Sequence, residues 1–366
     1  MTTRERVMAI FEHRPVDRLP WLANMDHWYN VNKKKGALPE RYREWKLWDI
    51  QKDLGSGIWQ RCGVTRGVEN PTIRRTSTTE DGLLRVVVET PAGTLTEAFR
   101  VSTDYASTQF RVEWMVKGRE DLPAALYLIE AGRTEPAYEG FAEVDREVGP
   151  DGIALSGACS DPVVSARHFL GIEQFSYLLA DAPEDMDRLI AALTRQAVEQ
   201  TKVAAAGPAR IYQCGGNMEA QVVSPRLFER YAQPFFEQVT DILHAHGKLA
   251  QYHFDGFLKP LAPWIGRTGL DIVEGFTPLP QGDMTLAELL EVTPPELALQ
   301  GAVPSCVLCE GFPEKEFERL VADAIELGKK SGRLVLGLGD NTPPDAIVAR
   351  VGRIGEMVEA DGWVGR

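Results

Sequence analysis

Cysteine is scarce in this chain and does not occur in recognisable pairs. The 366 residues include five cysteines, an odd number spread over the whole length: Cys62, Cys159, Cys214, Cys306 and Cys309. Proteins that depend on a disulfide framework carry many cysteines in even numbers. The scarcity therefore argues against such a framework and predicts a protein of the reducing cytoplasm.

Basic charge and long apolar runs are also in short supply. Lysine and arginine total 40 against 53 acidic residues, so the formal net charge is −13. A nucleic-acid backbone demands a basic surface, and this balance argues against such a partner. It is compatible with a small molecule or a protein with basic patches. No apolar stretch is long enough to span a bilayer or resembles a signal region, so we expect no membrane association.

The chain lacks a glycine-rich dinucleotide fingerprint, although short apolar runs alternate with long helical patterns from about residue 120 onward. Such alternation predicts parallel strands, and without the fingerprint a closed barrel is favoured over a doubly wound sheet. We therefore predict an α/β fold, a (β/α)8 TIM barrel that occupies residues 1–366 as a single domain. The expected strands are 18–24, 153–155, 210–213, 249–253, 270–274, 297–300 and 334–336.

One barrel strand cannot be placed by its pattern. We expect it near residues 108–116 or among the short runs after residue 300. The expected helices are 3–12, 161–181, 184–206, 225–246, 257–267, 285–292, 313–330 and 344–361.

Residues 26 to about 118 look like an N-terminal elaboration placed before the main repeat. Period-2 alternation over 72–103, around Asp81-Gly82 and Ala92-Gly93, predicts an antiparallel β-meander with hairpin turns. Residues 26–48 are an irregular, aromatic and basic stretch. Within it, Trp28 and Tyr29 either form an aromatic wall over the barrel mouth, which we favour, or belong to the core of the elaboration.

Polar residues stand where the expected strands end. Barrel enzymes place their chemistry at the C-terminal ends of their strands, and a purely structural interior would use branched apolar residues there instead. These positions therefore predict a polar cup. Its residues are Asn24, Asp26, Ser156, Gln213, Cys214, His253, Asp255, Glu274, Gln300, Asp340 and Asn341.

His253 and Asp255 are two residues apart, so in a continuous strand their side chains point to the same side. An imidazole and a carboxylate at this spacing are either two ligands of a divalent metal or a proton-transfer pair. In the structural alternative, Asp255-Gly256 caps a helix that starts near Phe257.

Glu274 and Asp340 each end another apolar strand and are further candidates, with turn chemistry as the alternative for Asp340-Asn341. Cys306 and Cys309 form a lone C-x-x-C, without the second pair that a zinc ribbon needs. This favours two core cysteines, and it leaves Cys306 as a reserve ligand because it lies just past a strand end.

Four segments resemble the uroporphyrinogen decarboxylase superfamily and keep that family's order. They are residues 4–20 (RERVMAIFEHRPVDRLP), 223–231 (VSPRLFERY), 243–248 (LHAHGK) with 253–256 (HFDG), and 337–344 (GLGDNTPP). The resemblance covers nearly the whole chain. It implies a (β/α)8 barrel with its active site at the C-terminal ends of the strands.

The resemblance also bears on the reaction. Decarboxylases of the superfamily carry a Gln-Ala-Gly-Arg-Tyr-type run after the first strand, whose arginines hold substrate carboxylates, whereas this chain has MDHWYNVNKKKG at 25–36. Methyltransferases of the superfamily often bind zinc through His-x-Cys and a later cysteine. Here His253 matches, while Asp255 and Asp340 replace the cysteines. The chain looks more similar to the corrinoid-linked O-demethylases, which remove methyl groups from methoxylated aromatic compounds.

This similarity implies a methyltransferase that moves a methyl group from a small methoxylated substrate to the cobalt of a corrinoid protein. It implies His253, Asp255, Glu274 and Asp340 as catalytic residues. Zinc would be held by His253, Asp255 and Asp340, with Glu274 or Cys306 as a further ligand. Without a metal, His253 and Asp255 would donate the proton. The implied substrate-binding residues are Asp26, Trp28, Tyr29, Gln213, Asn217 and Asn341.

Two other functions stay open. One is a metal-independent decarboxylase of a porphyrinogen-like or other carboxylated substrate, with Lys33, Lys34, Arg41 and Arg43 as candidate anchors. The other is a non-catalytic protein that binds a tetrapyrrole or corrinoid. A homodimer is compatible with the sequence.

Overall fold

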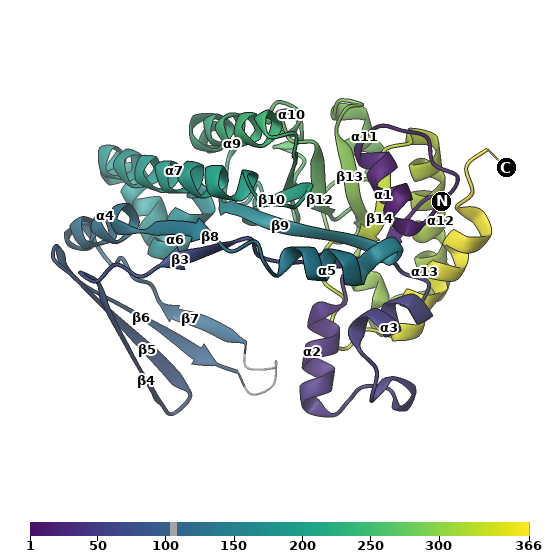
Figure 1. Cartoon of the computed structure of the whole chain (residues 1–366), viewed down its shortest axis with the longest axis horizontal. Coiled ribbons are helices and arrows are strands. Elements are labelled where there is room, and N and C mark those ends of the chain that lie inside the picture. Colours follow the sequence, from purple (N-terminus) through teal and green to yellow (C-terminus); the bar gives the residue numbers. More distant parts are fainter. Residues whose placement is uncertain (103–107, 366) are drawn as a thin grey trace.

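Short buried apolar runs form parallel strands around a common core in this computed structural model, which describes residues 1–102 and 108–365. Eight strands lie side by side in the order β1-β14-β13-β12-β11-β10-β9-β2 (Figure 1). They are β1 (Trp21–Leu22), β2 (Ile58–Arg61), β9 (Gly152–Ser160), β10 (Ile211–Gly215), β11 (Leu249–His253), β12 (Ile272–Phe276), β13 (Ala298–Val303) and β14 (Leu334–Leu338). The predicted (β/α)8 barrel is confirmed.

The barrel closes between its first two strands. Leu22 and Gly57 form an isolated parallel bridge, and the Gly57 N–H donates to the carbonyl of Trp21 at 2.9 Å. On its other side, β2 pairs in parallel with the first half of β9. Closure thus removes the open edges that β1 and β2 would otherwise present.

Helices cover the outside of the barrel (Figure 1). Those that follow β9 are α6 (Pro162–Asp181), α7 (Pro183–Ala205), α8 (Pro225–Leu227), α9 (Gln233–Ala245), α10 (Ala262–Ile265), α11 (Leu286–Val292), α12 (Glu314–Ser331) and α13 (Val348–Asp361). In the part of the chain that the structure describes, no helix is both long and apolar enough to cross a membrane.

Helix α1 (Thr3–Phe11) fills the N-terminal end of the barrel. A capping box between Thr2 and Glu5 starts this helix. Its apolar residues share one buried cluster with residues of the strands: Val7, Ile10, Phe11, Leu22, Trp59, Ile153, Leu155, Ile211, Ile272, Ala298 and Val335. Because this end is filled, the C-terminal strand ends form the face that is available for chemistry.

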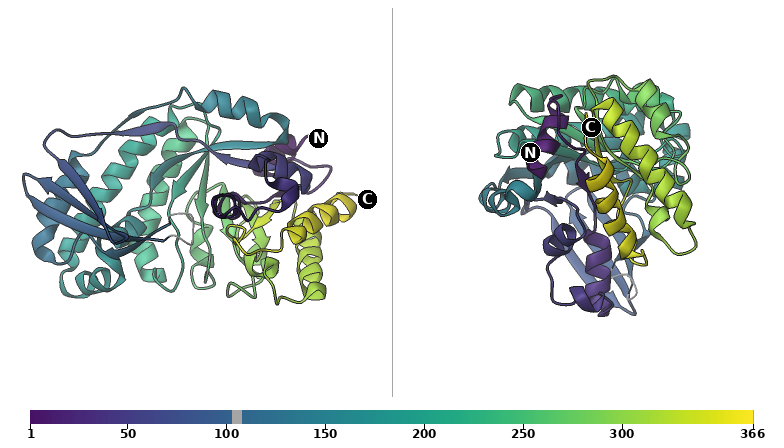
Figure 2. Two further views of the ribbon diagram at one scale, coloured as in Figure 1. Left: turned by 90° about the horizontal axis from the view of Figure 1, so that it is seen from below. Right: turned by 90° about the vertical axis from the view of Figure 1, so that its right-hand side faces the viewer.

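The N-terminal elaboration contains the predicted antiparallel meander. Its sheet has the order β4-β5-β6-β7, and a separate ribbon pairs β3 with β8. Residue 103, the end of the expected meander, lies outside the described residues. The sheet lies at the end of the molecule away from both termini (Figure 2). Apart from β2, the α-helices and strands between β1 and β9 are α2 (Asp26–Lys35), α3 (Leu47–Asp53), β3 (Thr65–Val68), β4 (Arg74–Glu80), β5 (Leu83–Thr90), β6 (Gly93–Val101), β7 (Gln109–Glu113), α4 (Leu122–Ala131), β8 (Arg133–Pro136) and α5 (Phe141–Val148).

The prediction for the remaining barrel strand is wrong. That strand is β2, whereas segment 108–116 supplies β7, the edge strand of the antiparallel sheet. Only Ile58 and Trp59 of β2 are apolar, and the run ends at once in Gln60 and Arg61. A strand with two apolar residues gives too weak a pattern to be recognised by periodicity.

Residues 26–35, expected to be irregular, form helix α2. Its last turn holds Lys33, Lys34 and Lys35, where positive charge interacts favourably with the helix dipole. Gly36 ends the helix in the left-handed conformation, with φ of 64°.

The helices expected over 257–267 and 344–361 are shorter than predicted, the second because it begins only at Val348, whereas the segment expected over 225–246 is helical but interrupted. The segment 257–267 contains only α10, and Pro260 and Pro263 lack the N–H groups that a longer helix needs. In segment 225–246, a π-helical turn at Phe228–Ala232 separates α8 from α9. Pro234 is the second residue after this turn and cannot donate to a carbonyl within it.

A substitution at the close contact between β2 and β9 would test the packing that closes the barrel. A Cβ atom on Gly152 would lie 2.0 Å from the carbonyl oxygen of Ile58. We expect Gly152→Ala to lower the free energy of unfolding by about 1–3 kcal/mol or more, as overpacking does elsewhere, measured by denaturant unfolding. Gly63→Ala is the control, because nothing lies within 4 Å of its added Cβ. Equal stability of the two variants would contradict this packing.

Candidate active site

Two neighbouring strands hold a histidine against a buried glutamate. His253 ends β11 and lies in register with Glu274 of β12. The His253 Nδ1 atom is 2.7 Å from Glu274 Oε2, and the side chains are 18% and 6% exposed. The structure thus brings together two residues that the sequence places at separate strand ends.

The Glu274 carboxylate has two further neighbours. The Gln213 side chain, from β10, donates through Nε2 to Glu274 Oε2 at 3.0 Å. Arg61, from β2, places its NH2 atom 3.9 Å from the same oxygen. Groups from β2, β10 and β11 therefore surround one buried carboxylate of β12, which is how a buried charge is normally compensated.

Asp255 lies on the other side of the His253 ring. Its Oδ2 atom is 3.6 Å from His253 Nε2, which is beyond hydrogen-bonding distance. Asp255 does not start a helix, because the N–H groups of Leu258 and Lys259 donate to Asp283 instead. The carboxylate is left available to the face of the site where His253 Nε2 points.

Both partners of the His253–Glu274 pair are charged. Burial works against an imidazolium, but the carboxylates of Glu274 and Asp255 outweigh it and raise the pKa of His253 to about 10. Burial also works against the Glu274 carboxylate, yet the charge of His253, helped by Arg61, holds its pKa below the usual value. At neutral pH, His253 is therefore a protonated donor at Nε2.

Arg61 is a site residue that the sequence analysis missed. It ends β2, its side chain is 53% exposed, and it lies close enough to Asp26 to influence that carboxyl group. The pKa of Asp26 is raised nonetheless, because loss of solvent around the carboxyl group outweighs the attraction of Arg61. Arg61 was missed because β2 was not recognised in the sequence. Recognition of that strand would have placed Arg61 at a C-terminal strand end.

A cavity of ≈ 1140 Å³ opens beside these residues. Arg61 and Gln213 both line it, so it reaches the groups that contact Glu274. Its wall also includes the ends of β9 and β10 and the β3–β8 ribbon. Among the described residues, its lining includes four arginines and a single acidic residue: Arg61, Arg74, Arg75, Arg133 and Glu69.

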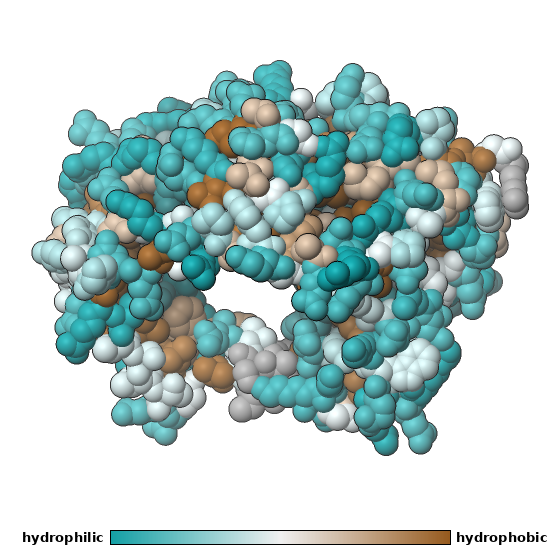
Figure 3. All heavy atoms as spheres, in the orientation of Figure 1, coloured by the Kyte–Doolittle hydropathy of each residue, from teal (hydrophilic) through white to brown (hydrophobic). Residues whose placement is uncertain are grey.

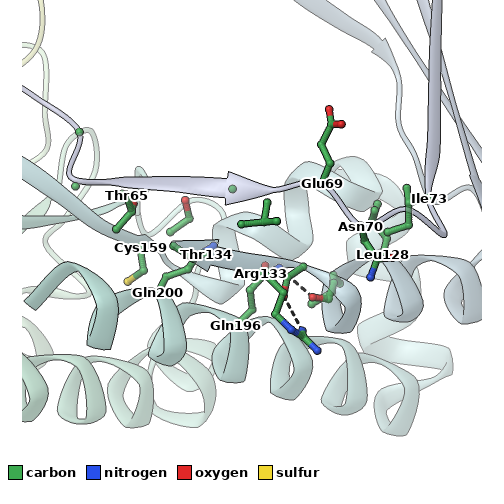
Figure 4. A pocket seen from close by; sticks show the side chains of 18 of the residues that line it. Thr65, Glu69, Asn70, Ile73, Leu128, Arg133, Thr134, Cys159, Gln196 and Gln200 are labelled. Atoms are coloured by element: carbon green, nitrogen blue, oxygen red, sulfur yellow. Dashed lines mark hydrogen bonds between the residues drawn. The ribbon is translucent and has the colours of Figure 1, made fainter. Parts of the chain in front are cut away.

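Amide and hydroxyl side chains line the floor of this cavity. Figure 4 shows Gln196 and Gln200 of α7 beneath the ribbon, near Thr65 and Thr134, whereas Glu69 points away from the helices. The Gln196 side chain donates to the carbonyl of Ile129 at 3.0 Å, which fixes its position. The lining therefore combines polar and apolar groups with an excess of positive charge, in a chain whose net charge is −13.

Several expected site residues lie apart from His253. Asp340 and Asn341 follow β14 and bond to each other, from Asn341 Nδ2 to Asp340 Oδ1 at 2.9 Å. Among the described residues, no hydrogen bond or ion pair joins either of them to His253. Asn217 is exposed after β10, and its carbonyl accepts a long contact from Arg167 at 3.5 Å.

The expected aromatic wall is not present as such. Trp28 and Tyr29 are 3% and 8% exposed and belong to the main buried cluster. The Tyr29 hydroxyl donates to the carbonyl of Trp45 at 2.9 Å. These contacts agree with the alternative in which both rings form the core of the elaboration.

The expected zinc ligands do not form a metal site in this arrangement. Over residues 1–102 and 108–365, no three His, Cys, Asp or Glu side chains are grouped so that they could hold a metal ion. Zinc binding by His253, Asp255 and Asp340 therefore stays a prediction, while the contacts that the described residues make around His253 are those of a proton-transfer pair.

The charge of His253 depends on Glu274 and can be measured directly. We expect Glu274→Gln to lower the His253 pKa from about 10, because burial then outweighs the remaining attraction of Asp255. NMR titration of the histidine ring resonances checks this shift. Glu173→Gln, on the exposed face of α6, should leave the titration unchanged. An unchanged His253 pKa in Glu274→Gln would refute the ion pair.

Comparisons with known proteins agree with this architecture. Among solved structures, a methyltransferase from Methanosarcina mazei is similar at 15% sequence identity and a TM-score of 0.62. The match covers 98% of this chain and 99% of that one, and at this identity the likeness concerns the fold. None of the curated proteins matches significantly. Residues 110–360 match the family described as uroporphyrinogen decarboxylase (URO-D), and the protein therefore belongs to that family.

Proposed function

We propose that this protein is a methyltransferase that moves a methyl group from a methoxylated aromatic substrate to the cobalt of a corrinoid on a partner protein. This reaction is an O-demethylation. Membership of the uroporphyrinogen decarboxylase family and the similar fold of a methyltransferase from Methanosarcina mazei support the proposal. The observation that carries it is the contact of 2.7 Å between His253 Nδ1 and the buried Glu274 carboxylate, at the C-terminal end of β11.

Cleavage of an aryl methyl ether needs a proton donor at the ether oxygen. As cobalt(I) supplies the electron pair that takes the methyl group, the C–O bond breaks and its electrons pass to the oxygen. His253 Nε2–H then gives its proton to that oxygen, so that a phenol leaves and a neutral imidazole remains. The carboxylates around His253 raise its pKa above the ordinary value, so the imidazolium that makes this transfer is present at neutral pH.

The neighbouring residues prepare His253 for this step. Glu274 accepts from Nδ1, which fixes the ring orientation and leaves the Nε2 proton for the substrate. Gln213 holds the Glu274 carboxylate in place at 3.0 Å. Asp255, 3.6 Å from Nε2, helps to keep the imidazole protonated between turnovers.

A methyl acceptor on another protein must reach the substrate. The space-filling view shows an opening between the four-stranded sheet and helix α2 (Figure 3). The edge strand β7 and its continuation expose large apolar side chains, with Phe110 at 51%, Val112 at 47% and Trp114 at 37%. Exposed apolar groups of this kind are typical of surfaces that contact partners, which supports docking of a corrinoid protein there.

The charge of the large cavity favours a second candidate, decarboxylation of a carboxylated substrate. Its four arginines, which include Arg61, would attract an anion. Two of the four anchors expected from the sequence are otherwise engaged, since Lys33 donates to the Tyr29 hydroxyl and Arg41 pairs with Asp53. Release of carbon dioxide from a porphyrinogen by the pure protein, without a corrinoid, would favour this candidate.

The direct test is methyl transfer from a panel of methoxyarenes to cobalt(I) corrinoid, followed by visible absorption and phenol release. We expect His253→Gln to lower the rate by about 10²–10⁴-fold, the usual contribution of a general acid. His246→Gln, an exposed histidine at the end of α9, is the control and should retain full activity. Failure to transfer a methyl group from any of the donors to any corrinoid protein would contradict the proposal.

The pH dependence separates proton donation from a merely structural role of His253. The donor is protonated below its pKa, so the transfer rate should hold through neutral pH and fall as the pH passes about 10. In Glu274→Gln the fall should begin at lower pH, because the His253 pKa is lower there. Identical pH profiles for the two proteins would show that His253 is not the donor.

A further inference from the structure

The four-stranded antiparallel sheet has two edges, which differ in their surroundings. Strand β7 forms one edge and lies against α6, where the Arg111 side chain donates to the carbonyl of His168 at 2.9 Å. Strand β4 forms the other edge, at the lower left of the molecule in Figure 1. All seven residues of β4 are exposed, so this edge is open to solvent on both faces of the sheet.

The turn that joins β4 to β5 determines which backbone groups of β4 point outward. Glu80 pairs with Leu83, and the two residues between them form the loop. Both loop residues, Asp81 and Gly82, have a positive φ, of 50° and 71°, as in a type I′ turn. The carbonyl of the residue before such a turn accepts from the N–H of the residue after it. The backbone hydrogen-bonding groups of Glu80 therefore face β5.

Alternate residues of β4 then face away from β5, because hydrogen-bonded and non-hydrogen-bonded pairs alternate along an antiparallel ladder. The register with β5 runs without a shift from Arg74 to Glu80. The outward N–H and C=O groups are those of Arg75, Ser77 and Thr79. Within residues 1–102 and 108–365, no hydrogen bond joins these groups to another element. Such a row of unpaired groups is a template for another strand.

Strand β4 lacks the features that usually prevent pairing at an exposed edge. Its sequence, RRTSTTE, contains neither proline nor lysine, and its three threonines favour a strand. Its charges are also not of one sign, since two arginines open the strand and a glutamate ends it. A strand with opposite charges at its two ends is complementary to a second copy of itself that runs in the antiparallel direction.

We propose that this edge binds a second copy of the same chain, so that two β4 strands pair antiparallel and the protein forms a homodimer. The two four-stranded sheets then join into one continuous sheet. This proposal goes beyond the proposed methyl transfer and does not depend on it.

Symmetry and charge together define the register of this pairing. A two-fold axis between antiparallel strands brings one residue opposite its own copy, and Ser77 is the outward-facing middle residue of β4. With the axis at Ser77, Arg75 faces Thr79 of the second copy, and the outward groups of all three residues are paired. Arg74 lies opposite Glu80 of the second copy, in a non-hydrogen-bonded pair whose side chains are close, so an ion pair forms at each end of the seam.

The antiparallel arrangement keeps the two barrels apart. The start of β4 follows β3 and leads back to the barrel, whereas its end is the turn to β5. The two-fold axis places the start of one β4 beside the end of the other, so the two barrels lie at opposite ends of the seam. Strand β7 is at the far edge of each sheet and stays available to a corrinoid protein.

A seam of seven residues from each copy is small for an interface. Interfaces that bury less than about 1,200 Å² are typically weak and transient. We therefore expect a dimer that dissociates on dilution. Sedimentation velocity between about 1 µM and 1 mM, which spans moderate to weak affinity, measures the dimer fraction.

Ser77→Pro tests the backbone hydrogen bonds at the axis. Proline lacks the N–H group and is tolerated on an edge strand where that group faces solvent, so β4 should stay paired with β5. We expect this variant to remain a monomer at concentrations where the wild type is a dimer. Ser77→Ala is the matched control, because it keeps the N–H group and should dimerise like the wild type.

Glu80→Arg tests the register through charge. It places arginines opposite each other at both ends of the seam and should weaken the dimer roughly ten-fold, because like charges directly opposite are destabilising. Arg74→Glu should also weaken it, although this variant loses the ion pair of 3.1 Å with Glu89 in its own chain. A mixture of the two variants restores opposite charges at both ends, so we expect a mixed dimer.

Two cysteine variants distinguish this register from random association. In Ser77→Cys the new thiols face each other across the axis at a Cα separation of about 5.5 Å, which a disulfide spans. In Thr78→Cys they are diagonal neighbours about 7–8 Å apart, beyond the usual reach of a disulfide. Mild oxidation should therefore crosslink the first variant and not the second. The wild type, with its five cysteines, gives the background.

Three results would overturn the proposal. The first is a wild type that stays monomeric over the whole concentration range. The second is a dimer that Ser77→Pro and Glu80→Arg leave unchanged, because another surface would then form it. The third is equal crosslinking of Ser77→Cys and Thr78→Cys, which would show collision rather than a defined register.

Discussion

The buried carboxylate of Glu274 is the feature on which the rest of the candidate site depends. Removing a carboxylate from water is costly, and it is tolerated only where charge and hydrogen bonds compensate it. His253, Gln213 and Arg61 supply that compensation from three different strands. Because each strand contributes one group, the site exists only when the barrel is closed with these strands in register.

Closure also gives the barrel two ends of different character. Helix α1 fills the N-terminal end with apolar side chains, so ligands of the candidate active site approach from the C-terminal strand ends. The seam between β1 and β2 includes the Leu22–Gly57 bridge, and buried hydrogen bonds also join Ala23 to Ser56 and Gln51.

Family membership determines the barrel fold, whereas the residues at the strand ends determine the chemistry, as in other folds that support many reactions. In this chain Asp255 and Asp340 stand where methyltransferases of the superfamily often have cysteines. The structure keeps Asp255 beside His253 and leaves Asp340 bonded to Asn341. Because Glu274 holds one ring nitrogen of His253 and leaves the other available, the proposed reaction rests on His253 as an acid.

The sequence by itself determined the barrel, the antiparallel meander and the position of His253 at a strand end, because periodicity and turn chemistry are local properties. It did not reveal β2, whose two apolar residues carry little pattern, and so it missed Arg61. Only the tertiary structure decided that Glu274 holds His253 and that Trp28 is core. Register and burial depend on contacts between segments far apart in the chain, and no local pattern contains them.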